Sequence, residues 1–495
     1  MSMVINTNTA SLVAQAAQAK TSSAMDTAME RLSTGKRINT AADDAAGMSI
    51  STRMEANIRG LSMAMKNAGD AQSLIDTAEG AHIEIDNILQ RMRELAVQAA
   101  SDTNTPEDRA ALNDEVNQLV TEIDRISAQT TWGGMNLMDG TYASKSFHVG
   151  SYANETVGVS IDSVASASLG AYVANSASHL MEGTVVGADA ETRTGTGLTI
   201  TGPVNAASIS FSAEASAKTV AAAVTAQSAT TGVSAEARTN VVLDTLSHAG
   251  TVSFTLSGTG SASISTTVSA TTDLRTLRDA INSVAGTTGI TASMYAGNNA
   301  KLMLTSATGE DIGISNFAST GDAASTIKAY KTDFDGVVTT TTDTLTRGTG
   351  DDSVIAVGQI RFTSTGEFTV ADAASGGTGY MAAASTTASQ SAISSVSVST
   401  AANANSAITA IDGALNKISD ARANLGAISN RLDHTISNLS NIKVNTESSQ
   451  SRIQDADFAA ETSNLTKAQI LSQAATAMLA QANASKQSVL SLLQG

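Results

Sequence analysis

A stripe of apolar residues between positions 44 and 99 constrains the fold of this 495-residue chain more than any other feature. Ile50, Met54, Ile58 and Leu61 follow one another at steps of three or four residues, which is the spacing that places side chains on one face of an α-helix. At 1.5 Å per residue, the stripe predicts a helix of roughly 80 Å. An uninterrupted helix of this length is typical of a coiled coil or a helical bundle.

A second helix has a recognisable start soon after the first. Thr105 can cap the helix, Pro106 suits the first helical position, and Asp108 stands three residues after the cap as an acidic partner. A third apolar stripe runs between residues 408 and 439, near the other end of the chain. A narrow apolar stripe must pack against another apolar surface, and the simplest arrangement is that these three helices pack against one another. We therefore expect the two ends of the chain to form one helical rod together.

Residues 1–41 and 451–495 are rich in alanine and carry only a thin apolar face. Small side chains bury little area, at about 25 cal/mol per Å², whereas ordering the backbone costs about 1–2 kcal/mol per residue. We expect these segments to fray when alone and to order when packed among many copies, as an assembly element does. The predicted polymerisation core consists of Met25, Met29, Leu32, Ile470, Leu471, Met478, Leu490 and Leu493.

The middle of the chain, roughly residues 169–400, lacks helical periodicity and is dominated by Thr, Ser, Gly and Ala. Short alternating runs at 208–211, 252–256 and 359–362 predict strands with one buried face. A repeat occurs at an offset of 57 residues, and each copy predicts a short helix, a glycine turn and a strand. The matching positions are Val220, Ala223, Val224, Gly232, Val233 and Ala235 in the first copy, and Leu277, Ala280, Ile281, Gly289, Ile290 and Ala292 in the second.

The predicted fold is therefore mainly α at the paired termini, as a long-helix bundle or coiled coil with a β-hairpin, plus a β-rich outer region. The only tryptophan, Trp132, follows the second helix and is expected to anchor the core or the hairpin.

Charge and cysteine content exclude several classes of protein. Lys and Arg number 29 against 46 Asp and Glu, which leaves a net charge of −17 and disfavours nucleic-acid binding. The chain has no cysteine, so disulfides, thiol catalysis and zinc–cysteine sites are excluded. The first twenty residues lack a secretory signal pattern, and no run of about 20 apolar residues predicts a membrane helix. We expect a soluble chain that binds no membrane and, if exported, leaves the cell by another route.

The sequence contains no catalytic constellation. The five histidines are scattered and form no metal-binding pair, and no nucleophile–base pair can be proposed. Asp333-Phe334-Asp335-Gly336 resembles the start of a calcium loop but lacks the bidentate glutamate, so we interpret it as a solvated turn. We predict that the chain is not an enzyme and has no cofactor or metal site. The alternative from a different functional class is that residues 170–400 contain an adhesin or a glycan-binding module.

Both ends of the chain resemble bacterial flagellin, the subunit of the flagellar filament. At the amino end the resemblance lies in residues 30–39 (ERLSTGKRIN) and 89–98 (LQRMRELAVQ). At the carboxyl end it lies in residues 451–458 (SRIQDADF) and 479–483 (LAQAN). Several long motifs in family order, at both termini, make the resemblance specific. The alternative with the same terminal pattern is a hook–filament junction protein, a class that shares this pattern more weakly.

The resemblance implies a multi-domain rod with an inner layer made by the paired termini and a variable middle that lies outward. The implied domains are an inner core (1–41 and 451–495), a helical rod (42–170 and 401–450) and outer domains (171–400). The implied function is that of a secreted, extracellular filament subunit for swimming motility, a homopolymer formed by coupled folding and polymerisation. The expected partners are the flagellar cap, hook-associated proteins and an export chaperone at the carboxyl-terminal segment, with export of the unfolded chain through the flagellar type III channel.

The resemblance also implies a role for three residues. In flagellins of this type the innate-immune Toll-like receptor five recognises an arginine and a leucine on the long helix and a glutamate on the next, at positions that match Arg91, Leu95 and Glu115. The same surface packs between subunits in the filament of the family. Arg91 and Glu115 equally suit an ordinary solvated helix face, and Leu95 continues the apolar stripe, so both interpretations stay open.

Overall fold

The computed structural model describes residues 7–101, 103–177, 180–182, 197–212, 215–322, 325–347, 352–372, 380–381 and 383–494. The chain divides into two compact units. Unit 1 comprises Met1–Ile75, Ser144–Val159 and Gly426–Gly495, and unit 2 comprises Asp76–Ala143 and Ser160–Leu425. Both chain ends therefore belong to unit 1, although unit 2 lies between them in the sequence.

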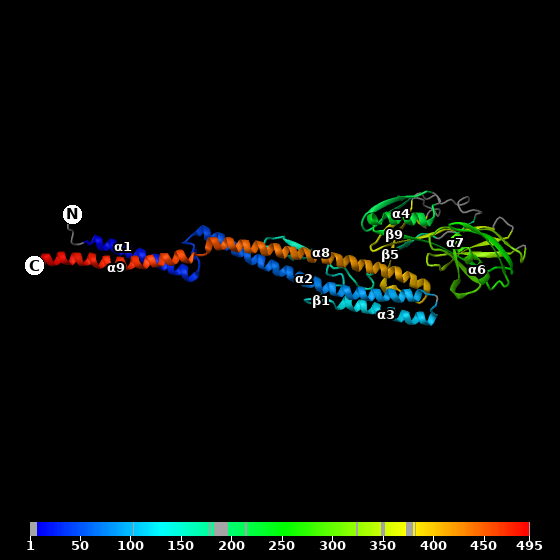
Figure 1. Cartoon of the computed structure of the whole chain (residues 1–495), viewed down its shortest axis with the longest axis horizontal. Coiled ribbons are helices and arrows are strands. Elements are labelled where there is room, and N and C mark those ends of the chain that lie inside the picture. The colour runs from blue at the N-terminus through cyan, green and yellow to red at the C-terminus, as the bar shows by residue number, and fades with distance from the viewer. Residues whose placement is uncertain are drawn as a thin grey trace. The chain divides into compact units, whose positions relative to one another are not determined.

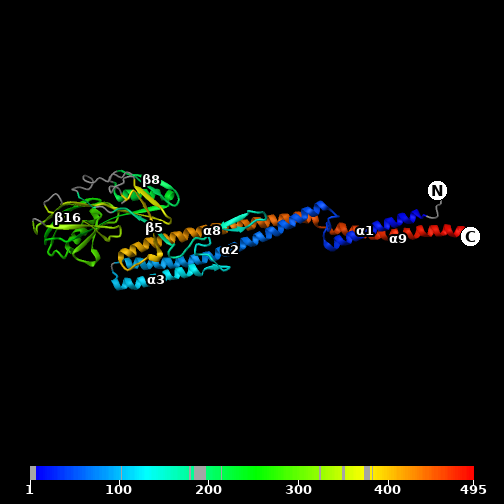
Figure 2. The ribbon, with the colours of Figure 1, turned by 180° about the vertical axis from the view of Figure 1, so that it is seen from behind.

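Long helices occupy the segments in which the sequence predicts them (Figure 1). They are α1 (Thr9–Thr34), α2 (Ala45–Ala100), α3 (Pro106–Gln129), α8 (Ala401–Gln454) and α9 (Phe458–Gln494). In unit 1, α1 and α9 lie side by side, as Figures 1 and 2 show from opposite directions. None of the described helices combines the length and the apolar content that a membrane crossing requires.

The apolar stripes of α2 and α8 form their buried faces. Within unit 2, ion pairs connect the two helices: Arg422 Nε lies 2.8 Å from Glu79 Oε1, and Arg93 Nε lies 2.7 Å from Asp412 Oδ1. Apolar burial is the main source of stability for such a pair of helices, since half-exposed ion pairs contribute little. The buried stripe residues include Ile58, Leu61, Ile75, Ile85, Leu89, Met92 and Leu95 of α2, and Ile411, Ile418, Leu425, Leu432 and Leu439 of α8.

The start of α3 confirms the predicted capping box. The Thr105 hydroxyl accepts a hydrogen bond from Asp108 N at 3.2 Å, and the Asp108 carboxylate accepts one from Thr105 N at 3.0 Å. These hydrogen bonds lower the pKa of Asp108 below its usual value. After α3, the hairpin of β1 (Thr131–Trp132) and β2 (Met135–Asn136) contains the half-buried Trp132. A second hairpin, β3 (Lys145–His148) with β4 (Thr156–Val159), belongs to unit 1.

The described part of the middle region folds into antiparallel sheets, as the alternating runs predict. The largest sheet runs in the order β12-β13-β9-β18-β5-β21, and β15 joins it at β9 and pairs with β16. Its strands are β5 (Gly170–Asn175), β9 (Val233–Asp244), β12 (Thr291–Met294), β13 (Lys301–Ser306), β15 (Thr326–Thr332), β16 (Val338–Thr346), β18 (Gln359–Ser364) and β21 (Ser389–Ala392).

The described part of the region contains two smaller sheets as well. One has the order β11-β10-β14-β17-β6 and the other β20-β19-β7-β8. The first consists of β6 (Leu180–Glu182), β10 (Gly250–Ser257), β11 (Ser261–Val268), β14 (Ile312–Ser319) and β17 (Val354–Ala356). The second consists of β7 (Gly197–Thr201), β8 (Ala206–Ser210), β19 (Thr369–Asp372) and β20 (Ser385–Thr387). Short 3-10 turns occur at η1 (Tyr295–Gly297) and η2 (Ile393–Ser395).

The repeat predicted at an offset of 57 residues is present in the structure. Its first copy contains α4 (Ala217–Ala226), α5 (Ser228–Thr231) and the start of β9, and its second contains α6 (Arg275–Ser283), α7 (Ala285–Thr288) and β12. Gly232 and Gly289 end the two helical segments with left-handed φ angles of 72° and 70°, a conformation that favours glycine. A β-hairpin precedes the helices in each copy, β7–β8 in the first and β10–β11 in the second.

The interpretation of Asp333-Phe334-Asp335-Gly336 as a solvated turn is wrong. Phe334 is buried, and the Asp335 carboxylate accepts hydrogen bonds from Arg361 on β18 and from Ser406 on α8. The turn therefore connects the large sheet to a long helix within unit 2. Its partners come from strands and helices far along the chain, so local sequence carries no sign of its burial.

Candidate assembly surface

The pair of α1 and α9 brings the two ends of the chain together. α1 begins after Asn8, whose side-chain oxygen accepts a hydrogen bond from Ser11 N and whose amide donates one to Ala482 O on α9. α1 ends at Gly35, whose N–H donates to Arg31 O at 2.9 Å. Alanine-rich helices such as these approach closely but bury little apolar area.

A short antiparallel bridge joins the two chain segments where α1 ends and α9 begins. Lys36 pairs with Asp455 as an isolated β-bridge. On either side of it, Arg37 N donates to Gln454 O at 2.6 Å and Ala456 N donates to Gly35 O at 2.9 Å. These backbone hydrogen bonds set the register of α1 against α9, since a shift of either helix would break them.

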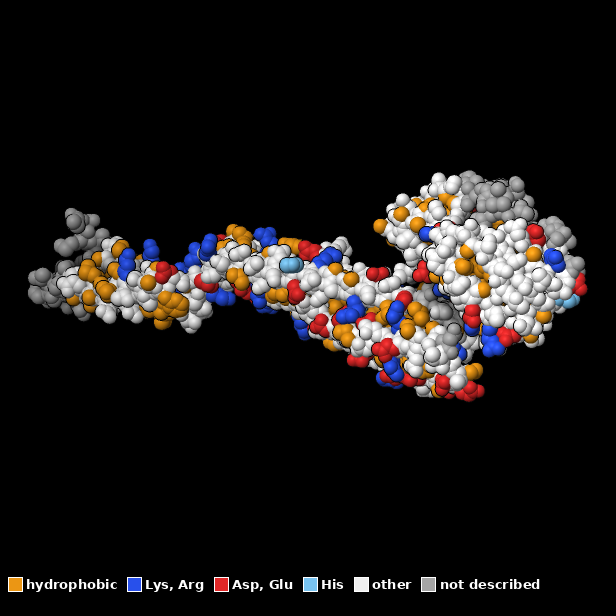
Figure 3. All heavy atoms as spheres, turned by 45° about the vertical axis from the view of Figure 1, so that its right-hand side comes forward, with side chains coloured by type: hydrophobic (Ala, Val, Ile, Leu, Met, Phe, Trp, Pro, Cys, Tyr) orange, Lys and Arg blue, Asp and Glu red, His pale blue; other side chains and the backbone are white. Residues whose placement is uncertain are grey.

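Four residues of the predicted polymerisation core are exposed in the single chain. Ile470 and Met478 on α9 are 61% and 64% exposed, and Met29 on α1 and Leu471 on α9 are also exposed. Figure 3 shows hydrophobic side chains gathered on the surface of this helical pair. Exposed large apolar side chains gathered on one pair of helices are typical of a site that another molecule covers.

The other predicted core residues differ in their surroundings. Met25 and Leu32 are half-buried on α1. The side chains of Leu490 and Leu493 lie outside the described residues. The prediction omitted Val13, an exposed residue of α1 that lines an apolar groove together with Ala17, Ala475 and Met478. A β-branched residue within an alanine-rich helix is the signal by which Val13 could have been found.

Charge is divided unequally between the two units. Unit 1 carries 13 Lys and Arg against 12 Asp and Glu, whereas unit 2 carries 16 against 34. The net charge is therefore +1 for unit 1 and −18 for unit 2. A nearly neutral surface can pack against copies of itself without strong repulsion, whereas a strongly acidic one repels its copies. This division favours a subunit that associates through unit 1.

Arg91 and Glu115 form an ion pair at the surface of unit 2. Arg91 Nη2 lies 2.8 Å from Glu115 Oε1, and the two side chains are 50% and 44% exposed. Hydrogen bonds with Glu115 and with Glu94 raise the pKa of Arg91. Leu95, by contrast, is only 1% exposed and belongs to the apolar face of α2. Two of the three residues to which the resemblance points thus lie together at the surface, and the third is in the core.

Known proteins match the chain along its whole length. The bacterial flagellin N-terminal helical region matches residues 5–143, and the bacterial flagellin C-terminal helical region matches residues 408–493. The chain is 39% identical to the B-type flagellin of Pseudomonas aeruginosa and 34% identical to a flagellin of Salmonella typhimurium, in each case with all of both chains covered. The chain belongs to the bacterial flagellin family. Flagellins are structural proteins, so this member is a subunit of the flagellar filament, which serves motility, and is not an enzyme.

A further relative is consistent with this assignment to the flagellins. Flagellin B of Vibrio cholerae is 32% identical, again with all of both chains covered. A solved structure of FliC from Burkholderia pseudomallei covers 73% of this chain and 99% of its own at 18% identity, with a TM-score of 0.29. Flagellin filaments are extracellular and consist of many copies of the subunit, so this flagellin polymerises with itself into an extracellular filament.

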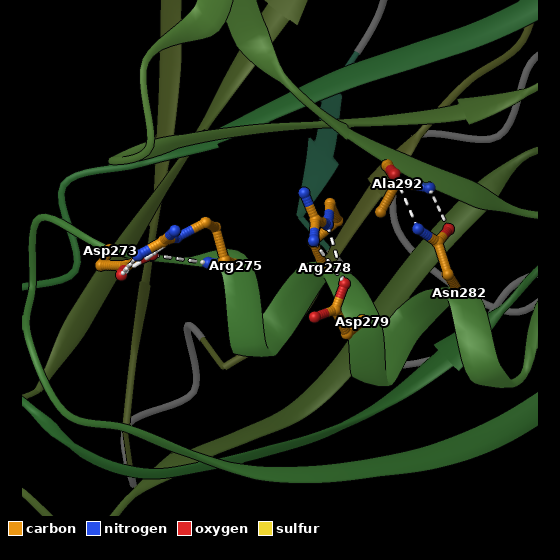
Figure 4. Close-up of polar contacts among 6 residues, drawn as sticks. All are labelled: Asp273, Arg275, Arg278, Asp279, Asn282 and Ala292. Atoms are coloured by element: carbon orange, nitrogen blue, oxygen red, sulfur yellow. Dashed lines mark hydrogen bonds and ion pairs between the residues drawn. The ribbon is translucent and has the colours of Figure 1, made fainter.

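The flagellin hook IN motif matches residues 251–308, which contain the second copy of the internal repeat. In that copy the Asn282 side chain forms two hydrogen bonds with the backbone of Ala292, as Figure 4 shows. In the first copy the hydroxyl of Thr225, at the equivalent position, forms the same two bonds with the backbone of Ala235. The two copies thus share their folded form and their helix-to-strand contact, although the family motif matches only the second.

Proposed function

We propose that this flagellin assembles by burying the exposed apolar side chains of α1 and α9 against neighbouring copies. The observation that carries the proposal is the exposure of Ile470, Leu471 and Met478 on α9 and of Met29 on α1. Burial of one such side chain contributes about 1.5–3 kcal/mol. Ordering the backbone opposes folding by about 1–2 kcal/mol per residue, so a helical pair that buries few large side chains gains most of its stability from its neighbours. Folding of the termini and polymerisation are then coupled.

Truncation of the chain before residue 455 tests this mechanism. The full chain and the truncated chain are each mixed with short filament fragments as seeds, and growth is followed by electron microscopy. We expect filaments from the full chain and none from the truncated one, because α1 then lacks its partner α9. Far-ultraviolet circular dichroism should show that α2, α3 and α8 remain helical in the truncated chain. Filaments of normal length from the truncated chain would contradict the proposal.

The proposal extends to export and to the partners that the resemblance implies. The chain is exported unfolded through the flagellar type III channel, for which the absence of cysteine is favourable because no disulfide can restrain the chain. An export chaperone covers the carboxyl-terminal segment, whose apolar side chains would otherwise be exposed. Growth of the filament takes place beneath the flagellar cap and begins on hook-associated proteins.

The proposal also includes recognition by the innate-immune Toll-like receptor five. The supporting observation is that Arg91 and Glu115 offer a preformed, half-exposed ion pair on adjacent helices. A receptor that binds this surface would contact the pair directly, whereas the buried Leu95 would support the position of Arg91 from within. The same surface faces neighbouring subunits in the filament of the family, so the free subunit presents it and the filament covers it.

A further inference from the structure

His82 occupies a position on the apolar face of α2 at which a polar side chain is unexpected. It follows Ile75 and Ala78 and precedes Ile85 at helical spacing, and all four residues are buried. His82 itself is 1% exposed, and neither Nδ1 nor Nε2 has a hydrogen-bond partner among the residues that the structure describes. A buried imidazole without partners contributes nothing by hydrogen bonding and loses the interactions that water would provide.

Three charged groups act on His82. Glu79 lies one turn earlier on α2, Arg422 lies on α8, and Asp162 lies in the segment after β4. Glu79 and Arg422 are paired with each other at 2.8 Å, so their opposite effects on an imidazolium largely cancel. Asp162, like Glu79, favours the protonated ring, and the loss of hydration on burial opposes both.

Burial is the largest effect, and it lowers the pKa of His82 below its usual value of 6.5. The unfolded chain therefore binds a proton at His82 at a higher pH than the folded chain does. The contribution of the neutral ring to the free energy of unfolding is fully present above pH 6.5. It is lost as the pH falls from 6.5 toward the lower pKa that His82 has in the folded state. Acidification hence favours the unfolded or loosened state.

We propose that His82 is an acid-sensitive position in the helical core of this flagellin, at which protonation loosens the packing of α2 in unit 2. Mild acid then destabilises the subunit, and with it the filament that the subunit builds. The effect on the filament depends on the proposed coupling of folding and assembly, whereas the effect on the free subunit does not. The two effects are therefore tested separately.

The first experiment measures the melting temperature of the full-length subunit by circular dichroism between pH 7.5 and pH 5. The variants are His82→Leu, which fills the apolar site, and His82→Gln, which keeps a neutral polar group. We expect acidification to lower the melting temperature of the wild type by about 2–4 °C more than that of either variant. His434→Gln is the matched control because His434 is exposed on α8, and this variant should follow the wild type.

Equal pH dependence in the wild type and in both His82 variants would overturn the proposal. If His82→Leu does not fold, the pH dependence of the melting temperature is compared between the wild type and His82→Gln alone, because glutamine has no titrating group in this pH range. The second experiment transfers preformed filaments from pH 7.5 to pH 5 and measures the released subunit by sedimentation. Wild-type filaments should release subunits faster than His82→Leu filaments. A pH effect on the free subunit without a difference between the filaments would contradict the coupling and leave the role of His82 in the subunit intact.

Discussion

The guanidinium carbon of Arg361 lies 4.2 Å from the centre of the Phe334 ring. The same guanidinium is paired with the carboxylate of Asp335, and only 6% of the Arg361 side chain is exposed. A charge this deeply buried is tolerated because both an aromatic face and a carboxylate compensate for the lost water. Since Ser406 of α8 also donates to Asp335, this pair is a direct link between the large sheet and the long helix of unit 2.

Replacement of Asp335 by alanine should destabilise unit 2 strongly, because Arg361 would remain buried without its counter-charge. We expect the free energy of unfolding to fall by about 3–5 kcal/mol in urea denaturation. The double variant Asp335→Leu with Arg361→Met should recover most of this loss, since it removes both charges. Glu122→Ala, at an exposed ion pair with Arg125, is the control and should change little. A small effect of Asp335→Ala would show that water, and not Asp335, compensates for the charge of Arg361.

The equivalence of Thr225 and Asn282 predicts which substitutions the first copy of the repeat tolerates. Thr225→Asn should preserve the two hydrogen bonds to Ala235 and leave the melting temperature nearly unchanged. Thr225→Val removes both bonds and should cost about 1 kcal/mol. Asn282→Ala should cost about 1–3 kcal/mol, because the backbone groups of the buried Ala292 lose their partners. Thermal unfolding measures all three, and equal losses for Thr225→Asn and Thr225→Val would refute the equivalence.

Polar substitution of Ile470 should impair assembly without unfolding the subunit. Ile470→Ser removes an apolar side chain that is exposed in the single chain, so its monomer should melt like the wild type. The critical concentration for seeded polymerisation should rise by about one to two orders of magnitude, if the side chain is buried in the filament. Val204→Ser alters an equally exposed apolar residue of unit 2 and should leave polymerisation unchanged. Similar effects of both variants would mean that α9 is not the specific contact.

Receptor signalling should depend on the ion pair of Arg91 and Glu115. The double variant Arg91→Ala with Glu115→Ala should require about ten-fold more protein for the same response in reporter cells, which corresponds to the loss of about 1.4 kcal/mol of binding free energy. The control is Arg125→Ala with Glu122→Ala, because that pair has nearly the same exposure and lies on α3. An unchanged response of the Arg91 and Glu115 variant would remove the receptor from the proposed function.

Periodicity and capping predict the helical part of the fold well, because both are local. The step pattern of Ile50, Met54 and Ile58 predicts the long helix α2, and Thr105 predicts the start of α3. Even the repeat is visible from the sequence, because its glycine turns at Gly232 and Gly289 each require a left-handed backbone. Local patterns of this kind need no knowledge of distant partners.

Other features could not be predicted, because they depend on partners that are distant in the sequence. The burial of Asp335 requires Arg361 and Ser406 together. The missing hydrogen bonds of His82 become evident only when α2 is packed. Helical periodicity, by contrast, does separate the buried Leu95, which continues the apolar stripe, from the exposed Arg91 of the same ten-residue motif.

The pairing of α1 with α9 has a consequence for how chains are selected. α1 precedes every other described helix in the chain and α9 follows them all, so the pair cannot form until α9 has been synthesised. A chain shortened at its carboxyl end by premature termination or by proteolysis can still fold α2 and α3, but α1 has no partner. Under the proposed coupling of folding and assembly, a growing filament would therefore exclude chains that lack α9.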